Sequence, residues 1–139
     1  LGAVGRDSHH LNYPSDCAFT GPGGLQLVVA DSRNDRVLIV GLDGSLRAMG
    51  LGGGFRVGAT LHCSGAGGML RPCAVAVDPH FGRIYVQDQS RVQAFDSQGR
   101  FLCVVFEGGG LGGEGVAVHG SQRCLVICEG NAHRLNLFK

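Results

Sequence analysis

The strongest constraint on this chain is a segment that occurs three times along it. The middle repeat, residues 70–107, reads LRPCAVAVDPHFGRIYVQDQSRVQAFDSQGRFLCVVFE, in which short apolar runs alternate with turn-forming residues. The first repeat spans residues 13–50 and the third spans residues 112–139. Self-similarity at a period of tens of residues is typical of architectures in which each repeat is one supersecondary unit.

The repeats align at the acidic residue that follows the second apolar run of each. Asp88 and Glu129 are 41 residues apart, whereas Asp31 and Asp88 are 57 residues apart. The additional residues between the first two repeats fall in a glycine-rich stretch over 50–68. We interpret this stretch as an insertion.

Each repeat predicts a small antiparallel sheet of short strands joined by tight turns. In the second repeat the turn 96–99 reads DSQG, a hairpin signal in which Gly99 supplies a positive φ. The strands expected there are 73–77, 83–87, 91–95 and 101–106, and those expected in the first repeat are 16–20, 25–30, 36–40 and 45–49. A four-stranded unit repeated about every 40 residues is typical of a propeller blade.

The same alignment predicts how the chain is organised. An outer strand and loop are expected at 1–12, with Leu1–Val4 at the outer edge of a neighbouring blade. The blades are expected at 13–49, 69–110 and 111–139, the last without its fourth strand. Propellers close at about four to eight blades. We therefore expect the missing blades to come from a longer chain, from another protein or from a second copy.

Composition and charge narrow the class of protein. The formal net charge is +1, which argues against a DNA-binding protein, and no apolar run reaches the roughly 18 residues of a membrane span. Most of the six cysteines lie in apolar runs and no C-x-x-C motif occurs. We expect buried free thiols, no cofactor, no membrane partner and a reducing, cytoplasmic location.

The repeated residues resemble those of the NHL-repeat family. The first repeat carries VADSRNDRV at 29–37, the second carries AVAV at 74–77 and IYVQD at 84–88, and the third carries GVAV at 115–118 and NAHRL at 131–135. The resemblance implies an all-β fold, a β-propeller of NHL-type four-stranded blades. NHL propellers are usually six-bladed rings, so about three blades make half of such a ring.

The polar residues that repeat gather in the turns between the second and third strands. We expect the acid to accept hydrogen bonds from the turn amides, the Asn to adopt the left-handed conformation and the Arg to pair with an acid or carbonyl. This structural role is expected for Asp31, Asn34, Arg36, Asp88, Arg91, Glu129, Asn131 and Arg134.

Because these turns are equivalent, they should line the same face of the molecule. A candidate binding surface is therefore predicted from Arg33, Asn34, Arg36, Arg91, His133 and Arg134. A second candidate contact site lies in the insertion, at Phe55, Arg56 and His62.

These features favour a non-catalytic scaffold that binds a protein partner or a second copy. An alternative is a face that binds single-stranded RNA, as the resemblance to the propellers of tripartite-motif ubiquitin ligases implies. A second alternative is a metal-dependent lyase or hydrolase, as a resemblance to the NHL-like amidating lyase, which binds zinc through histidines, would imply. His9 and His10 are adjacent and would point opposite ways in an extended chain, and the other four histidines fall in different loops or strand ends, so no metal site is predicted.

Overall fold

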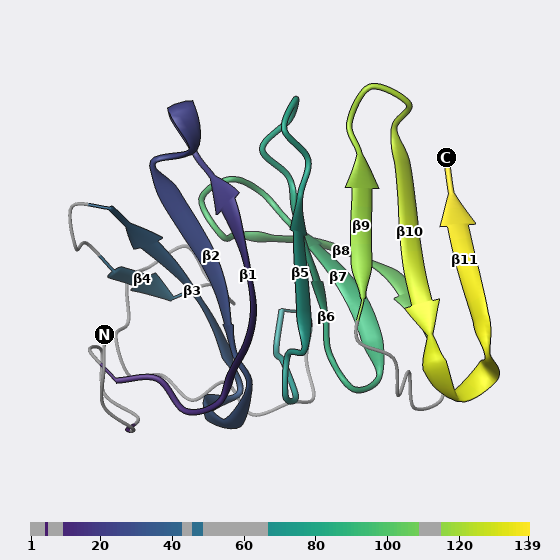
Figure 1. Cartoon of the computed structure of the whole chain (residues 1–139), viewed down its shortest axis with the longest axis horizontal. Helices are drawn as coiled ribbons and strands as arrows, with labels where there is room; N and C mark the ends of the chain where they lie inside the picture. The colour runs from purple at the N-terminus through teal and green to yellow at the C-terminus, as the bar shows by residue number, and fades with distance from the viewer. Residues whose placement is uncertain (1–4, 6–9, 43–45, 49–66, 109–114) are drawn as a thin grey trace.

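The chain folds into three antiparallel β-sheets that stand side by side (Figure 1). The computed structural model describes residues 5, 10–42, 46–48, 67–108 and 115–139. These residues form strands, turns and three short 3-10 segments, at Pro22–Gly24, Ser32–Asn34 and Gly130–Ala132, and contain no α-helix. The expectation of an all-β fold is confirmed.

Every sheet is a meander in which strands that follow one another in sequence are hydrogen-bonded neighbours. Sheet 1 contains β1 (Pro14–Thr20), β2 (Gln26–Asp31), β3 (Arg36–Gly41) and β4 (Leu46–Ala48). Sheet 2 contains β5 (Ala74–Val77), β6 (Ile84–Gln87), β7 (Arg91–Phe95) and β8 (Phe101–Glu107). Sheet 3 contains, in the described residues, β9 (Val116–His119), β10 (Cys124–Glu129) and β11 (Arg134–Phe138).

The strands lie close to the predicted ranges because the local signals act as expected. The hairpin between β7 and β8 is an example: Asp96 Oδ1 accepts hydrogen bonds from the amides of Gln98 (2.8 Å) and Arg100 (2.9 Å), and Gly99 has φ 78°. The clearest difference is at β1, which begins at Pro14, two residues before the predicted start, and β8 continues one residue beyond its predicted end, to Glu107.

Each sheet has two faces, which we name by chain order. The forward face points toward the next sheet and the rear face toward the preceding one. The forward face of sheet 1 packs on the rear face of sheet 2 in one cluster that contains Val28, Ala30, Val37, Ile39, Met69, Val75, Ile84, Val86 and Phe95. The forward face of sheet 2 packs on the rear face of sheet 3 around Val92, Leu125 and Ile127. Burying each of the Val, Leu, Ile, Met and Phe side chains in these clusters contributes about 1.5–3 kcal/mol.

Polar side chains also join neighbouring sheets. Asp16 Oδ2 of β1 accepts a hydrogen bond from the Val75 amide of β5 at 2.9 Å. Between sheets 2 and 3, the Gln87 amide group donates to Cys128 O (3.1 Å) and accepts from the Gly115 amide (3.3 Å). Gln87 is fully buried, so these bonds replace the water that its amide would lose on folding.

The five described cysteines are free thiols, but only Cys124 is buried; Cys73 and Cys128 are half-buried, and the expectation of buried thiols is wrong for Cys17 and Cys103, which are exposed. Leu1–Val4 and residues 50–66 of the insertion lie outside the described residues, as do Phe55, Arg56 and His62. In the part of the chain that is described, no helix is long and apolar enough to cross a membrane.

Candidate interaction surface

The turns between the second and third strands of the three sheets lie along the same edge of the molecule, at the bottom of Figure 1. Each turn holds a carboxylate against an arginine, and the paired atoms are Nε and a carboxylate oxygen. The distances are 2.7 Å for Arg36 with Asp31, 3.6 Å for Arg91 with Asp88 and 2.6 Å for Arg134 with Glu129.

In sheet 1 the carboxylate of Asp31 is the centre of a buried network. It is fully buried and accepts hydrogen bonds from the Asn12 amide (2.7 Å), Asn34 Nδ2 (2.8 Å) and Arg36 Nε (2.7 Å). Arg36 also donates from Nη2 to His10 O at 2.6 Å. The network therefore ties the segment before β1 to the turn after β2.

The expectation that Asn takes the left-handed conformation in these turns is wrong. The residues with left-handed backbone are Asp35 (φ 51°) and His133 (φ 53°), which cap the short 3-10 segments of the first and third turns. The side-chain amide of Asn34 instead donates hydrogen bonds to Asp31 Oδ2 and to Gly5 O (2.7 Å). The side chain of Asp35 accepts from the Arg71 amide at 2.9 Å, which links this turn to the segment before sheet 2.

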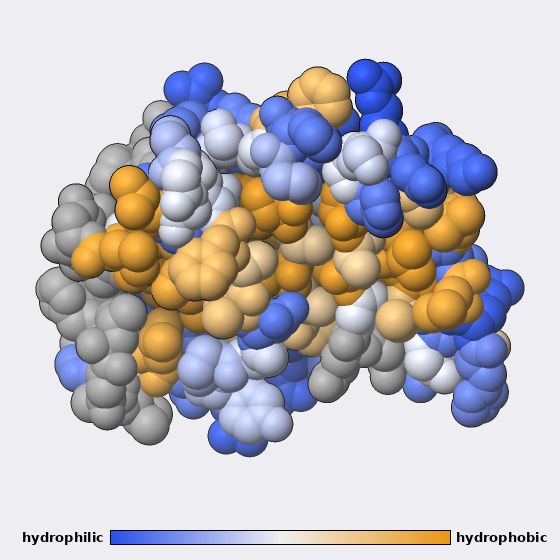
Figure 2. Space-filling view, turned by 45° about the horizontal axis from the view of Figure 1, so that its top comes forward, coloured by the Kyte–Doolittle hydropathy of each residue, from blue (hydrophilic) through white to orange (hydrophobic). Residues whose placement is uncertain are grey.

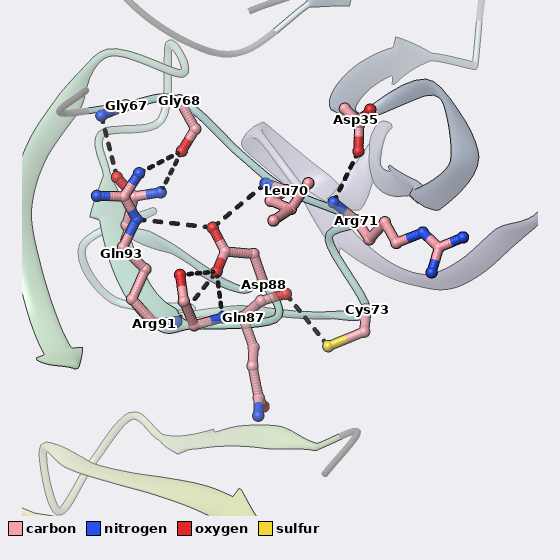
Figure 3. Close-up of polar contacts among 11 residues, drawn as sticks. Asp35, Gly67, Gly68, Leu70, Arg71, Cys73, Gln87, Asp88, Arg91 and Gln93 are labelled. Atoms are coloured by element: carbon pink, nitrogen blue, oxygen red, sulfur yellow. Dashed lines mark hydrogen bonds and ion pairs between the residues drawn. The ribbon is translucent and has the colours of Figure 1, made fainter. Parts of the chain in front are cut away.

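The second turn shows the expected role of the acid most fully (Figure 3). Asp88 Oδ1 accepts hydrogen bonds from the amides of Ser90 (2.8 Å) and Arg91 (3.0 Å). Arg91 Nη2 and Gln93 Nε2 both donate to Gly68 O, at 3.0 and 2.7 Å, and Gln93 Oε1 accepts from the Gly67 amide at 3.0 Å. The last two residues of the insertion are thus fixed to sheet 2.

The third turn is the most open of the three. Glu129 Oε2 accepts from Arg134 Nε (2.6 Å) and Asn136 Nδ2 (3.0 Å). The bond from Arg134, followed by the bond from Asn136, lowers the pKa of Glu129 below its ordinary value. The same carboxylate raises the pKa of Arg134. The side chain of Arg134 remains 59% exposed.

The predicted binding residues therefore divide into two groups. Asn34, Arg36 and Arg91 are buried or nearly so, the two arginine side chains being 11% and 14% exposed, and they bond within the fold. Arg33, His133 and Arg134 are exposed on the turn edge. Arg33 lies over the ring of Tyr13, 4.8 Å from its centroid.

The most exposed large apolar side chains were not among the predicted site residues. They include Leu135 (70% exposed) and Leu137 (60%) on β11 and Phe19 (66%) on β1. Figure 2 shows an apolar band that crosses one side of the molecule between hydrophilic margins. The L-x-L pattern of residues 135–137 was the signal available in the sequence, since it places both leucines on one face of a strand.

Metal-ligating side chains do not gather in the part of the chain that is described. No group of three or more His, Cys, Asp or Glu residues there is placed to hold a metal ion.

Comparisons with known proteins identify the fold and no family. No family model matches the chain, and no curated protein matches it. Among solved structures, the fold is similar to a chain of Kuenenia stuttgartiensis hydrazine synthase, with a TM-score of 0.59 and 16% sequence identity. The match covers 84% of this chain and 29% of that one.

Proposed function

We propose that this protein is a segment of an NHL-type β-propeller and acts as a non-catalytic scaffold that binds another protein. Three antiparallel meanders with the same register, packed forward face to rear face, are what successive blades would provide. The repeated acid–arginine pairs are consistent with the NHL resemblance, because they support each blade from within. The hydrazine synthase match contributes the fold alone and carries no argument for catalysis.

The observation that carries the binding role is the exposure of Leu135 and Leu137 on an ordered strand. Large apolar side chains that stay exposed together commonly mark contact sites for proteins. Most of the arginines that would make a basic face instead form ion pairs with carboxylates of the fold.

Affinity capture tests this role. The tagged chain is used as bait in an extract of its source cells, beside a Leu135→Ser/Leu137→Ser variant and a Leu102→Ser control. Leu102 is 47% exposed and lies near the start of β8, whereas β8 contacts β11 near its other end, through Phe106 and Phe138. A scaffold that uses β11 retains its partner in the control and loses it in the double variant. Capture that is equal in all three baits would overturn the proposal.

RNA binding is the second candidate, supported by the exposed Arg33, His133 and Arg134 on one edge. It predicts salt-dependent binding of a single-stranded oligonucleotide, measured by fluorescence anisotropy, that weakens in Arg33→Ala and Arg134→Ala. Arg36→Ala is unsuitable as a test because that side chain holds Asp31. Binding that is absent at low salt would exclude this candidate.

A further inference from the structure

Equivalent positions in the three sheets have the same strand register but very different exposure. Strand pairing matches Val37 in sheet 1 with Val92 in sheet 2 and Leu135 in sheet 3. The first two are fully buried, whereas Leu135 is 70% exposed. The position two residues later repeats the contrast, with Ile39 and Ala94 at 1% and Leu137 at 60%.

The difference in exposure follows from whether another sheet covers the forward face. These positions are on the forward face, which in sheets 1 and 2 is covered by the rear face of the next sheet. In Figure 1 sheet 3 is at one end of the row, with β11 outermost. Its forward face therefore has the composition of a buried face and no covering sheet among the described residues.

The rear face of sheet 1 is the corresponding surface at the other end. Its β1 side chains Cys17 and Phe19 are exposed, Phe19 by 66%. They occupy the positions of Val75 and Val77 in sheet 2, which pack in the first cluster. Deeper on this face, Val29, Leu38 and Val40 are already buried with Leu11 and Leu27 beside them. The open part is thus the β1 side.

We infer that the forward face of sheet 3 docks on the β1 side of the rear face of sheet 1 in a second copy of this chain. This inference rests on the proposed scaffold function and names its partner. The contact continues the packing that the chain already uses twice, forward face on rear face. It is heterologous, so two different surfaces of each copy take part, and association runs head to tail.

Internal packing also says which residues meet. Val37 and Ile39 cluster with Val75 and Ile84 of the following sheet. In the second copy the positions of Val75 and Ile84 are held by Cys17 and Leu27, of which Cys17 is exposed and Leu27 half-buried. Leu135 and Leu137 would therefore lie against this pair.

Sedimentation velocity over a dilution series tests the inference with four proteins. The wild-type chain should exceed its monomer mass of 14.5 kDa at high concentration. Leu135→Ser/Leu137→Ser and Phe19→Ser should each weaken association by at least about tenfold, since each removes buried apolar area. Leu102→Ser should associate as the wild type does.

Mixing the two impaired variants gives the sharpest result. Phe19→Ser keeps an intact sheet 3 face and Leu135→Ser/Leu137→Ser keeps an intact sheet 1 face, so an equimolar mixture should form a one-to-one complex and nothing larger. A wild-type chain that stays monomeric, a Phe19→Ser variant with unchanged association, or a mixture that remains monomeric would overturn the inference. If the wild type stays monomeric but the β11 double variant still loses a protein that the wild type captures, the inference fails and the scaffold function remains supported.

Discussion

At the scale of single residues, the acid at the end of each second strand is a structural support whose importance depends on burial. Asp31 is fully buried and accepts three hydrogen bonds, one from the distant Asn12 amide. Removing such a carboxylate leaves Arg36 and two other donors without their acceptor inside the fold. Removing the acid of the third turn would instead leave an arginine that is already exposed and can be solvated by water.

We predict that Asp31→Ala lowers the free energy of unfolding by about 3–5 kcal/mol, the usual cost of breaking a buried ion pair. Asp96→Ala is a matched control, since Asp96 also accepts two amides but lies in an open hairpin. Its loss should be about 1 kcal/mol. Urea unfolding followed by far-ultraviolet circular dichroism measures both, and equal losses would contradict the role given to Asp31.

The Glu129–Arg134 pair predicts a pH dependence. Folding lowers the pKa of Glu129 below its ordinary value of 4.5, so the pair stabilises the fold above that pH. The contribution is lost as the pH falls through the lowered pKa. Wild type and Glu129→Gln should therefore differ in unfolding free energy at about pH 6, and the difference should shrink as the pH falls through the lowered pKa. A difference that is constant over this range would show that the ionised pair contributes nothing.

At the scale of elements, the strands could be predicted because their causes are local. Alternating apolar residues and turn formers fix β7 and its hairpin without reference to the rest of the chain. The burial of Gln87 and Gln93 could not be predicted, because their partners come from segments 28 and 26 residues away in sequence. The left-handed residues were misassigned because the chain forms a short 3-10 segment in the first and third turns, and the left-handed residue is the one that ends each segment, Asp35 and His133.

Gln87 predicts how sheets 2 and 3 are held together. Gln87→Leu keeps the volume but leaves Gly115 N–H and Cys128 C=O without their side-chain partner, which should cost about 1–3 kcal/mol. Amide hydrogen exchange at Gly115 should quicken at the same time. Gln89→Leu, on the exposed turn next to β6, should change stability by less than about 0.5 kcal/mol. An unchanged exchange rate at Gly115 would show that the side-chain bonds of Gln87 do not hold sheets 2 and 3 together.

At the scale of the whole molecule, the repeat in the sequence predicts equivalent sheets but not their different surroundings. Residues 91–95 and 134–138 occupy the same register, yet only the first strand has both faces covered. The exposure of Leu135 depends on the arrangement of the sheets, because it is decided by whether another sheet covers the forward face of sheet 3. For this reason the candidate surface was predicted on the arginine turns, while the open apolar face was missed.

The central claim is that the forward face of sheet 3 is an uncovered version of a face that sheets 1 and 2 bury. Hydroxyl-radical footprinting with mass spectrometry measures this directly, residue by residue. In dilute protein Leu135 and Leu137 should be oxidised much faster than Val37 and Val92, and they should become protected as the concentration rises. Protection of both leucines at every dilution, equal to that of the two valines, would contradict the account.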